Sequence, residues 1–320
     1  MNHKITIGIP TYNRENQLRH QLQCIIKQDL TFVEEIIIVD NHSNYDIVNS
    51  ISELNCTKLR LITNPFNIKM ATNMEMPFLY CKTEWLWLLS DDDEVLPDSI
   101  NTITDEIRNC HTDIGMIKFA IDRQSSIQRD YYAKSLEDYI DYYYNENIVR
   151  RGDLVFLSTC VLNMGKIRNH LGSAFEFSYS YLGFMMPVFF SLNENKIAVK
   201  FSSKPVVIFI PPREGWYSFG VVGKGLSTLS HLPLNLSNIY WRRFLNITMS
   251  ITYIAQISAC IKTQDKKTIR DFRIIYNNIY RYYLPNYTKV LIWLFFQLMS
   301  IRIGRAMLNS LKTILKKLKR

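Results

Sequence analysis

The residues best suited to chemistry are four consecutive acids, Asp91, Asp92, Asp93 and Glu94, which follow the apolar run Trp85–Leu89. Neighbouring carboxylates repel one another, so such a cluster is costly unless a cation balances it. Carboxylate oxygens are ligands that Mg²⁺ and Mn²⁺ prefer, and these ions keep positions open for water and phosphate oxygens. The cluster predicts a divalent-metal site formed by Asp91, Asp92 and Asp93. The alternative is a solvated turn that caps the next helix.

Polar residues also follow three other predicted strands, Ile5–Ile9, Glu35–Val39 and Leu59–Ile62. They are Pro10–Arg14 after the first run, Asp40–Ser43 after the second, and Asn64–Asn67 with Asn73 after the third. Residues at the carboxyl ends of parallel strands meet at one edge of a sheet, and open α/β sheets bind ligands there. These polar residues and the acids are therefore expected to form one site.

Helical patterns separate the apolar runs and define the fold class. Leu18, Leu22 and Ile25 recur at helical spacing after the first run, and Pro97 with Ile100 begins a similar pattern after the fourth. Strands buried on both faces and separated by helices predict an α/β fold with a doubly wound, mostly parallel sheet. A fifth strand is expected at Ile114–Phe119.

The first three polar segments suit a nucleotide. The carboxylate of Asp40 could accept a hydrogen bond from a base or a ribose, the Tyr12 ring could stack on the base, and Thr11 with the backbone near Pro10 could contact the ribose. Ordinary loop chemistry is the alternative for each residue alone. The chain has no G-x-G-x-x-G after the first strand and no G-x-x-x-x-G-K-[ST], which disfavours dinucleotide-binding and P-loop proteins.

Charge is distributed unevenly along the chain. Residues 262–320 contain 14 Lys and Arg against two Asp, a net charge of +12, so the first 261 residues carry −3 of the total of +9. A basic tail suggests nucleic acid or an anionic membrane as its partner. Nucleic acid is the poorer alternative, because no recognised nucleic-acid-binding motif accompanies the charge.

The sequence suggests a cytosolic protein associated with a membrane. The start of the chain lacks the apolar core of a signal peptide, and no window reaches the length of a spanning helix. Val290–Ile301 is apolar, and residues 302–319 alternate Leu and Ile with Lys and Arg. This pattern is typical of a basic amphipathic helix that lies in a membrane interface, with packing on the catalytic domain as the alternative. The six Cys are far apart and are expected to be free thiols.

We expect a catalytic domain at 1–237 and a basic helical region at 238–320. Within the first, the tyrosine-rich residues 121–153 are expected to be an insertion and residues 211–237 a mobile loop. Strands are expected at Leu154–Leu157 and Val206–Ile210, with a helix at Tyr179–Leu192.

The motifs together resemble family-2 glycosyltransferases of the GT-A fold. Ile-Pro-Thr-Tyr-Asn-Arg (9–14), Ile-Val-Asp-Asn-x-Ser (38–43) and Leu-Ser-Asp-Asp-Asp-x-x-Leu-Pro (89–97) occur in that family's order and approximate spacing. The Ser-Asp-Asp-Asp variant is similar to bacterial O-antigen sugar transferases, abequosyltransferase-like enzymes among them. The resemblance implies that Asp91, Asp92 and Asp93 supply the metal motif. It implies donor binding by Pro10, Thr11, Tyr12, Arg14, Asp40, Asn73 and Asp91.

The chain departs from the family pattern at three places. The family's Asp-Asp-Gly-Ser is Asp-Asn-His-Ser here, so His42 replaces a glycine, and in the family's Asn-x-Gly, Lys69 replaces the glycine. Family members often carry the catalytic base in a Glu-Asp pair at the start of a helix after the metal strand. The comparable helix here lacks an acid, so Glu176 just before it is the first candidate and Glu214 the second.

The resemblance implies transfer of a hexosyl or deoxyhexosyl group from a nucleoside-diphosphate sugar, with inversion and with Mn²⁺ or Mg²⁺. A lipid-linked oligosaccharide at the cytoplasmic face of the bacterial inner membrane is the expected acceptor, in O-antigen and lipopolysaccharide biosynthesis. Trp216 and Tyr217 could stack on an acceptor sugar. The alternatives are a non-catalytic membrane-bound partner that lost its base, and a nucleotidyltransferase. The latter would usually have a Gly-rich loop with a basic residue after the first strand, which Pro10–Arg14 is not.

Overall fold

The computed structural model describes residues 4–122, 128–145, 152–208, 219–249, 257, 260–261, 265–284 and 286–300. The chain divides into two compact units. The first comprises Met1–Tyr142 and Val155–Arg213, and the second comprises Tyr143–Leu154 and Glu214–Arg320. The helical region expected from residue 238 lies in the second unit.

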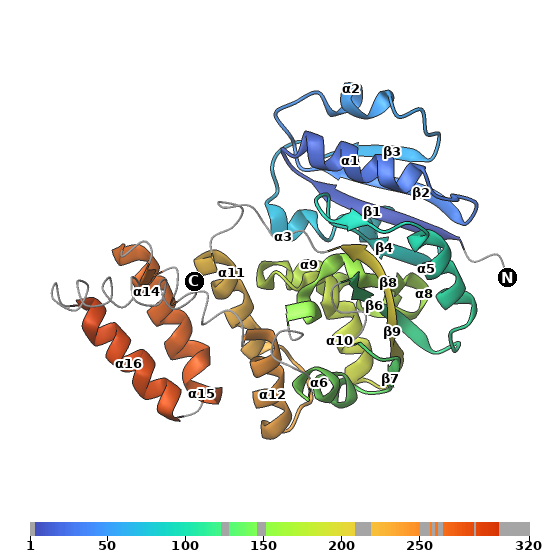
Figure 1. Cartoon of the computed structure of the whole chain (residues 1–320). Coiled ribbons are helices and arrows are strands. Elements are labelled where there is room, and N and C mark those ends of the chain that lie inside the picture. Colours follow the sequence, from blue (N-terminus) through green and yellow to red (C-terminus); the bar gives the residue numbers. More distant parts are fainter. Residues whose placement is uncertain are drawn as a thin grey trace, which may run out of the picture. The chain divides into compact units, whose positions relative to one another are not determined.

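The first unit is built on one sheet, which has nine strands in the described part of the chain (Figure 1). Their order is β3-β2-β1-β4-β8-β6-β9-β5, with β7 paired to β9. The strands are β1 (Ile5–Thr11), β2 (Val33–Asp40), β3 (Leu59–Thr63), β4 (Trp85–Leu88), β5 (Glu94–Val95), β6 (Ile114–Ile121), β7 (Tyr131–Ala133), β8 (Cys160–Asn163) and β9 (Ala198–Ile208).

The direction of the strands changes across the sheet. Strands β3, β2, β1 and β4 are parallel, as the apolar runs predict. Beyond them, β8 is antiparallel to both β4 and β6, and β9 is parallel to β6 but antiparallel to β5 and β7. The expectation of a mostly parallel, doubly wound sheet is therefore wrong for this half, and the sheet is mixed. An apolar run reads the same in either direction, so composition does not report strand polarity.

The predicted helical faces of the first unit are confirmed. Helix α1 buries Leu18, Leu22 and Ile25, and α5 buries Ile100 and Ile107. The helices are α1 (Glu15–Ile26), α2 (Ile47–Ser52), α3 (Met70–Asn73), α4 (Pro77–Tyr80), α5 (Ser99–Arg108), α6 (Leu136–Tyr144), α8 (Met164–Ile167), α9 (Leu171–Glu176) and α10 (Met186–Asn193). Short 3-10 helices lie at Leu157–Thr159, Arg168–His170, Ser178–Ser180 and Gly183–Met185. The last two residues of α6 and most of the 3-10 helix Gly152–Val155 belong to the second unit.

Two sequence expectations after residue 150 are corrected. Leu154–Leu157 is not a strand, because 3-10 turns occupy this region and the strand β8 begins only at Cys160. Tyr179–Leu192 is not one helix, because Tyr181 adopts φ 62° and two 3-10 turns precede α10. The strand expected at Val206–Ile210 corresponds to the end of β9.

The tyrosine-rich segment joins the sheet of the first unit. Strand β7 pairs with β9, and Tyr139 of α6 packs against Phe201 of β9, with 5.4 Å between ring centroids. The ring of Tyr142 stacks on Phe201 of β9, with 3.8 Å between ring centroids. Residues 131–142 therefore complete the core at this edge.

The second unit is helical in its described part. It contains α11 (Phe219–Leu226), α12 (Asn238–Met249), α14 (Lys266–Ile275), α15 (Arg281–Tyr283) and α16 (Asn286–Ser300), with a 3-10 helix at Ser227–His231 and a π-helical turn at Tyr276–Tyr280. Phe272 of α14 packs on Phe296 of α16, with 5.1 Å between ring centroids. Lys224 of α11 forms an ion pair with the buried Asp271 of α14 at 2.7 Å.

The mobile loop expected at 211–237 is wrong for Phe219–His231, which is helical. Gly223 and Gly225 suggest breaks in the sequence, but both are buried in α11. Tertiary context can override the low helix propensity of glycine, and both positions are buried here. Residues 209–218 and the amphipathic pattern at 302–319 lie outside the described residues. In the described part of the chain, every helix is too short or too polar to cross a bilayer.

Candidate active site

The ends of three parallel strands lie side by side at one edge of the sheet. Thr11 at the end of β1 is the register partner of Asp40 at the end of β2, and Asp40 is the partner of Thr63 at the end of β3. The Thr11 hydroxyl also donates to Oδ2 of Asp91 at 2.7 Å, from the loop after β4. Three predicted site residues, Thr11, Asp40 and Asp91, are therefore brought to the same edge.

Two of the three aspartates converge on Arg14. Its Nη1 lies 2.6 Å from Oδ1 of Asp91 and 3.1 Å from Oδ2 of Asp92. The Asp91 side chain is only 3% exposed and that of Asp92 12%. A single guanidinium nitrogen thus occupies a position between two carboxylates, where positive charge is most strongly favoured.

Asp93 points to different partners. Its Oδ2 accepts a hydrogen bond from the Ser158 hydroxyl at 2.5 Å, and its backbone carbonyl accepts one from Nε2 of Gln21 at 3.0 Å. Ser158 Oγ also accepts the backbone N–H of Ser90 at 2.9 Å. Asp93 therefore anchors the acidic loop to its surroundings. Ser158 and Gln21 were not predicted, since nothing in the sequence links them to a loop more than 60 residues away.

Burial dominates the protonation of this loop. Burial raises the pKa of Asp91 to about 6, because desolvation outweighs the attraction of Arg14 and the hydrogen bond from Thr11. Burial likewise raises the pKa of Asp93 to about 7, with the neighbouring carboxylates adding to the rise and the Ser158 hydrogen bond opposing it. Arg14 alone therefore does not fully compensate the acidic charge.

Asp40 and Asn73 hold the backbone at the ends of β1 and β2. Both carboxylate oxygens of Asp40 accept from the backbone N–H of Ser43, at 3.1 and 3.2 Å. Nδ2 of Asn73 donates to the carbonyls of Val39 and Thr11 at 3.2 and 3.4 Å, and its Oδ1 accepts from Asn64 at 2.8 Å. Asn73, buried to 3% exposure, thus braces the ends of β1 and β2.

The two lost glycines fall at positions with positive φ. His42 adopts φ 65° and Lys69 adopts φ 74° with ψ 156°. The latter conformation is essentially restricted to glycine, and another residue there costs on the order of 1–3 kcal/mol. A glycine would adopt these conformations without strain, whereas His42 and Lys69 adopt them with a Cβ atom.

The other predicted site residues differ in their exposure to solvent. Tyr12 is 40% exposed, and Pro10 is buried as the register partner of Val39. Glu176 is exposed at the last position of α9. Glu214, Trp216 and Tyr217 lie outside the described residues.

Glu75 is a buried acid that the sequence analysis did not single out. It is fully buried, and neither carboxyl oxygen has a hydrogen-bond partner of good geometry within the described part of the chain. A Cβ on Gly183 would lie 2.4 Å from Glu75 Oε1 and 2.4 Å from the carbonyl oxygen of Ala174. Glu75, two residues after Asn73 in the chain, therefore packs against Gly183 in the segment that leads to α10. Burial raises the pKa of Glu75 well above its ordinary value.

The fit of a metal can be judged from the acidic loop. Within the described residues, no group of three or more His, Cys, Asp or Glu side chains converges on one point. Magnesium-type sites that also bind substrate phosphates need only one or two carboxylates. Asp91 and Asp92, which already share one cationic partner, fit that requirement, whereas Asp93 faces Ser158.

Residues 6–162, about half of the chain, match the family described as Glycosyl transferase family 2. The match covers the strands β1–β4 and β6, the acidic loop and the asparagine network. A search of the curated proteins finds no match.

Solved structures with low sequence identity share the fold. TarS from S. aureus (residues 1–349) in complex with UDP-GlcNAc has a TM-score of 0.61 at 14% identity, covering 86% of this chain and 81% of that one. The mannosyltransferase PcManGT from Pyrobaculum calidifontis, in complex with GDP-Man and Mn²⁺, has a TM-score of 0.53 at 11% identity, covering 96% and 87%. These likenesses and the family match confirm a fold of the GT-A type.

Lys69 provides a test of backbone strain. Replacing it with glycine relieves the unfavourable φ, so Lys69→Gly is expected to raise the free energy of unfolding by about 1 kcal/mol. Lys69→Ala removes the same amino group but keeps the Cβ, and is the matched control. Chemical denaturation measures the free energy of unfolding of both variants. Equal values would contradict the inference that the backbone at Lys69 is strained.

Glu75 provides a test of pH dependence. In the unfolded chain Glu75 ionises near its ordinary pKa, whereas in the folded protein it stays neutral to higher pH. The folded state therefore retains a proton that the unfolded state loses, and stability falls as pH rises between the two pKa values. Glu75→Gln removes this pH dependence. The free energy of unfolding of the variant minus that of the native protein is therefore expected to increase with pH, by up to about 1.4 kcal/mol per pH unit.

The measurement is denaturant unfolding between about pH 5 and about pH 8. Glu34→Gln, at an exposed position of β2, is the control and should follow the native curve throughout. Parallel pH curves for Glu75→Gln and the native protein would show that Glu75 ionises normally in the folded state.

Proposed function

We propose that this protein, whose residues 6–162 form a glycosyl transferase family 2 domain, transfers a sugar from a nucleoside-diphosphate sugar to an acceptor hydroxyl. The observation that carries the proposal is the convergence of Asp91 and Asp92 on one cationic position. It lies at the same sheet edge as Thr11 and Asp40, where a nucleotide would bind. The similar structures contain UDP-GlcNAc or GDP-Man, which supports the donor class.

Asp91 and Asp92 would bind Mn²⁺ or Mg²⁺ together with the donor pyrophosphate. Such a metal stabilises the charge that develops on the leaving nucleotide. Arg14 contacts both carboxylates in this structure, and its guanidinium at the same position would also suit the donor phosphates. Asp93 would keep the loop in place through Ser158 rather than bind the metal.

The nucleoside would bind beside Asp40. Tyr12 is sufficiently exposed to stack on a base. Pro10, Thr11 and Asn73 are buried or held by hydrogen bonds, so they would shape the site through the backbone rather than through direct side-chain contact.

Glu176 is our first candidate for the base that deprotonates the acceptor, with inversion at the anomeric carbon as the expected outcome. A base needs access to the acceptor, and the exposure of Glu176 meets that requirement. Glu214 is the second candidate, with Trp216 and Tyr217 as acceptor-binding residues in the same segment. Loss of transfer on Glu176→Gln with unchanged donor binding would support the first assignment.

The acceptor is proposed to be a lipid-linked oligosaccharide at the cytoplasmic face of the bacterial inner membrane, in O-antigen and lipopolysaccharide biosynthesis. Helix α16 supports this, because it buries Ile292, Phe295, Phe296 and Met299 but leaves its other face apolar and open. The exposed residues are Tyr287, Val290, Leu291, Trp293 and Leu294, each at least 43% exposed.

An exposed apolar face of this kind marks an interaction surface. The net charge of +12 over residues 262–320 complements anionic lipids, and each Lys or Arg near such a surface contributes about 1 kcal/mol. An anionic membrane is therefore our proposed partner for this face. The transferred group would be a hexosyl or deoxyhexosyl unit.

The metal assignment predicts that Asp92→Asn abolishes metal-dependent donor binding. We expect UDP or GDP together with Mn²⁺ to raise the melting temperature of the native protein. In the variant, Mn²⁺ should add no stabilisation to that of the nucleotide. Transfer is expected to fall by about 100-fold or more, since a metal-anchored electrostatic contribution is lost. Asp105→Asn, an exposed position of α5, is the control.

Unchanged transfer by Asp92→Asn would refute the metal assignment. Donor binding without any transfer or hydrolysis would instead favour the alternative of a non-catalytic membrane-bound partner.

The membrane assignment predicts that removal of apolar surface from α16 weakens vesicle binding. The double variant Leu291→Ser, Trp293→Ser is expected to bind anionic phospholipid vesicles about tenfold or more weakly than the native protein, because two exposed side chains no longer enter the interface. Gln297→Ala, on the same exposed side, is the control. Co-sedimentation measures both, and equal binding by all three proteins would exclude α16 as the contact.

A further inference from the structure

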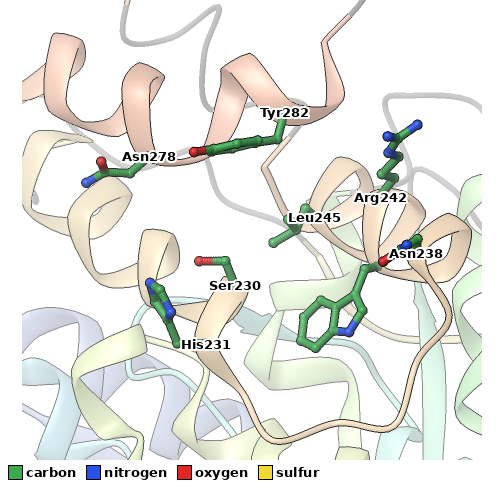
Figure 2. Close-up of a pocket in the computed structure, with 8 residues that line it drawn as sticks. Ser230, His231, Asn238, Arg242, Leu245, Asn278 and Tyr282 are labelled. Atoms are coloured by element: carbon green, nitrogen blue, oxygen red, sulfur yellow. The ribbon is translucent and has the colours of Figure 1, made fainter.

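The second unit contains a cavity of about 610 Å³ that the proposed transfer reaction does not use (Figure 2). This volume is within the range of about 300–1,000 Å³ that is usual for small-molecule sites. The cavity is lined by residues of the 3-10 helix Ser227–His231, α12, the π-helical turn and α15. They are Ser230, His231, Asn238, Trp241, Arg242, Leu245, Asn278 and Tyr282.

Two aromatic side chains line the cavity. Trp241 is half-buried, and Phe244 packs against its ring edge-on at 5.9 Å between centroids, which fixes the indole. Tyr282 is 57% exposed and has the guanidinium of Arg281 5.1 Å from its ring centroid. Each ring therefore offers apolar surface to a ligand while the rest of it is supported by the protein.

The polar side chains of the cavity have their hydrogen-bonding groups available. In the described part of the chain, the side chains of Asn238, Arg242 and Asn278 form no hydrogen bond or ion pair with other residues, and all three are exposed. Figure 2 shows Asn278 and Tyr282 on one side, with Ser230 and His231 opposite them. Amides supply both donors and acceptors, so the cavity can match a ligand with many hydroxyl groups.

The backbone around Asn278 is itself unusual. Tyr276–Tyr280 forms a π-helical turn, in which Ile279 and Tyr280 are buried while Asn278 is exposed at the cavity. Turns of this type are rare and are frequently found at functional sites. The turn presents Asn278 to the cavity without loss of the buried contacts on its other side.

The charge of the lining limits the ligand. Among the described residues that line the cavity there is no carboxylate, and Arg242 is the permanent cation. A cationic ligand is therefore disfavoured. Burial of a phosphate group usually requires several converging cations or backbone N–H groups, whereas here the guanidinium is exposed and solitary among the lining residues.

We propose that this cavity is a saccharide-binding site, distinct in its residues from the donor site, and that it takes a neutral or anionic oligosaccharide. Pyranose rings have an apolar C–H face, which packs on aromatic rings such as those of Trp241 and Tyr282. Their hydroxyl groups lie at the ring edge, within reach of Asn238, Asn278 and Arg242. Identification of this saccharide as part of the acceptor glycan rests on the proposed function, whereas saccharide binding itself does not.

The experiment measures binding of the full-length protein to immobilised bacterial polysaccharide fragments in neutral, uronate-bearing and phosphate-bearing sets, without any donor. Tyr282→Ala and Asn278→Ala are expected to weaken the binding by about tenfold or more, since each removes an anchor from the centre of the contact. Trp241→Ala should do the same. Tyr179→Ala, which removes an exposed tyrosine from the first unit, is the matched control and should bind as the native protein does.

Thermal-shift titration with nucleotide and Mn²⁺ runs in parallel on each variant and should be unchanged. A native protein that binds fragments but no nucleotide would support the cavity and contradict the proposed transfer reaction. The proposal is overturned if no set binds, if the three cavity variants bind as the native protein does, or if inorganic phosphate alone competes as well as the fragments.

Discussion

Three consecutive aspartates follow the buried strand β4, and their mutual repulsion has to be balanced before the loop can adopt one conformation. Arg14 supplies that balance, because one of its nitrogens contacts both Asp91 and Asp92. Arg14 lies between β1 and α1, whereas Asp91 and Asp92 follow β4. The ion pair therefore joins the segments that follow these two strands. Arg14 compensates the negative charge of the loop only in part, because burial still raises the pKa of Asp91 to about 6. The site is therefore suited to further positive charge, which a divalent cation would supply.

The rest of the strand edge is organised around this loop. Thr11 connects Asp91 to β1, Asn73 connects the ends of β1 and β2, and Ser158 fixes Asp93 from the segment before β8. Each contact joins residues that are distant in the chain, and each uses a side chain shorter than a lysine or an arginine. Short side chains lose little rotamer entropy when they are fixed, which suits a site that must be formed before its ligand arrives.

The second unit has two surfaces of different chemical character. The face of α16 that packs on Phe272 is apolar and buried, whereas its opposite face is apolar and exposed. The cavity formed by α12, the π-helical turn and α15 combines aromatic rings with amides that have no hydrogen-bond partner among the described residues. An apolar face favours contact with apolar groups, because both lose water on contact. A cavity with amides favours a ligand that can form hydrogen bonds, because a buried polar group without a hydrogen-bond partner is costly.

The sequence by itself determined the parallel strands β1–β4, the buried faces of α1 and α5, and the gathering of Thr11, Asp40 and Asp91 at one edge. These features depend on local periodicity and on the order of apolar runs, and the family motifs assigned them a chemistry. It also located the two replaced glycines, although only the backbone angles of His42 and Lys69 explained them. Tertiary structure alone decided the direction of β8, the division of the three aspartates between Arg14 and Ser158, and the burial of Glu75 against Gly183. Those outcomes depend on contacts between segments far apart in the chain, whose energies no local pattern of residues encodes.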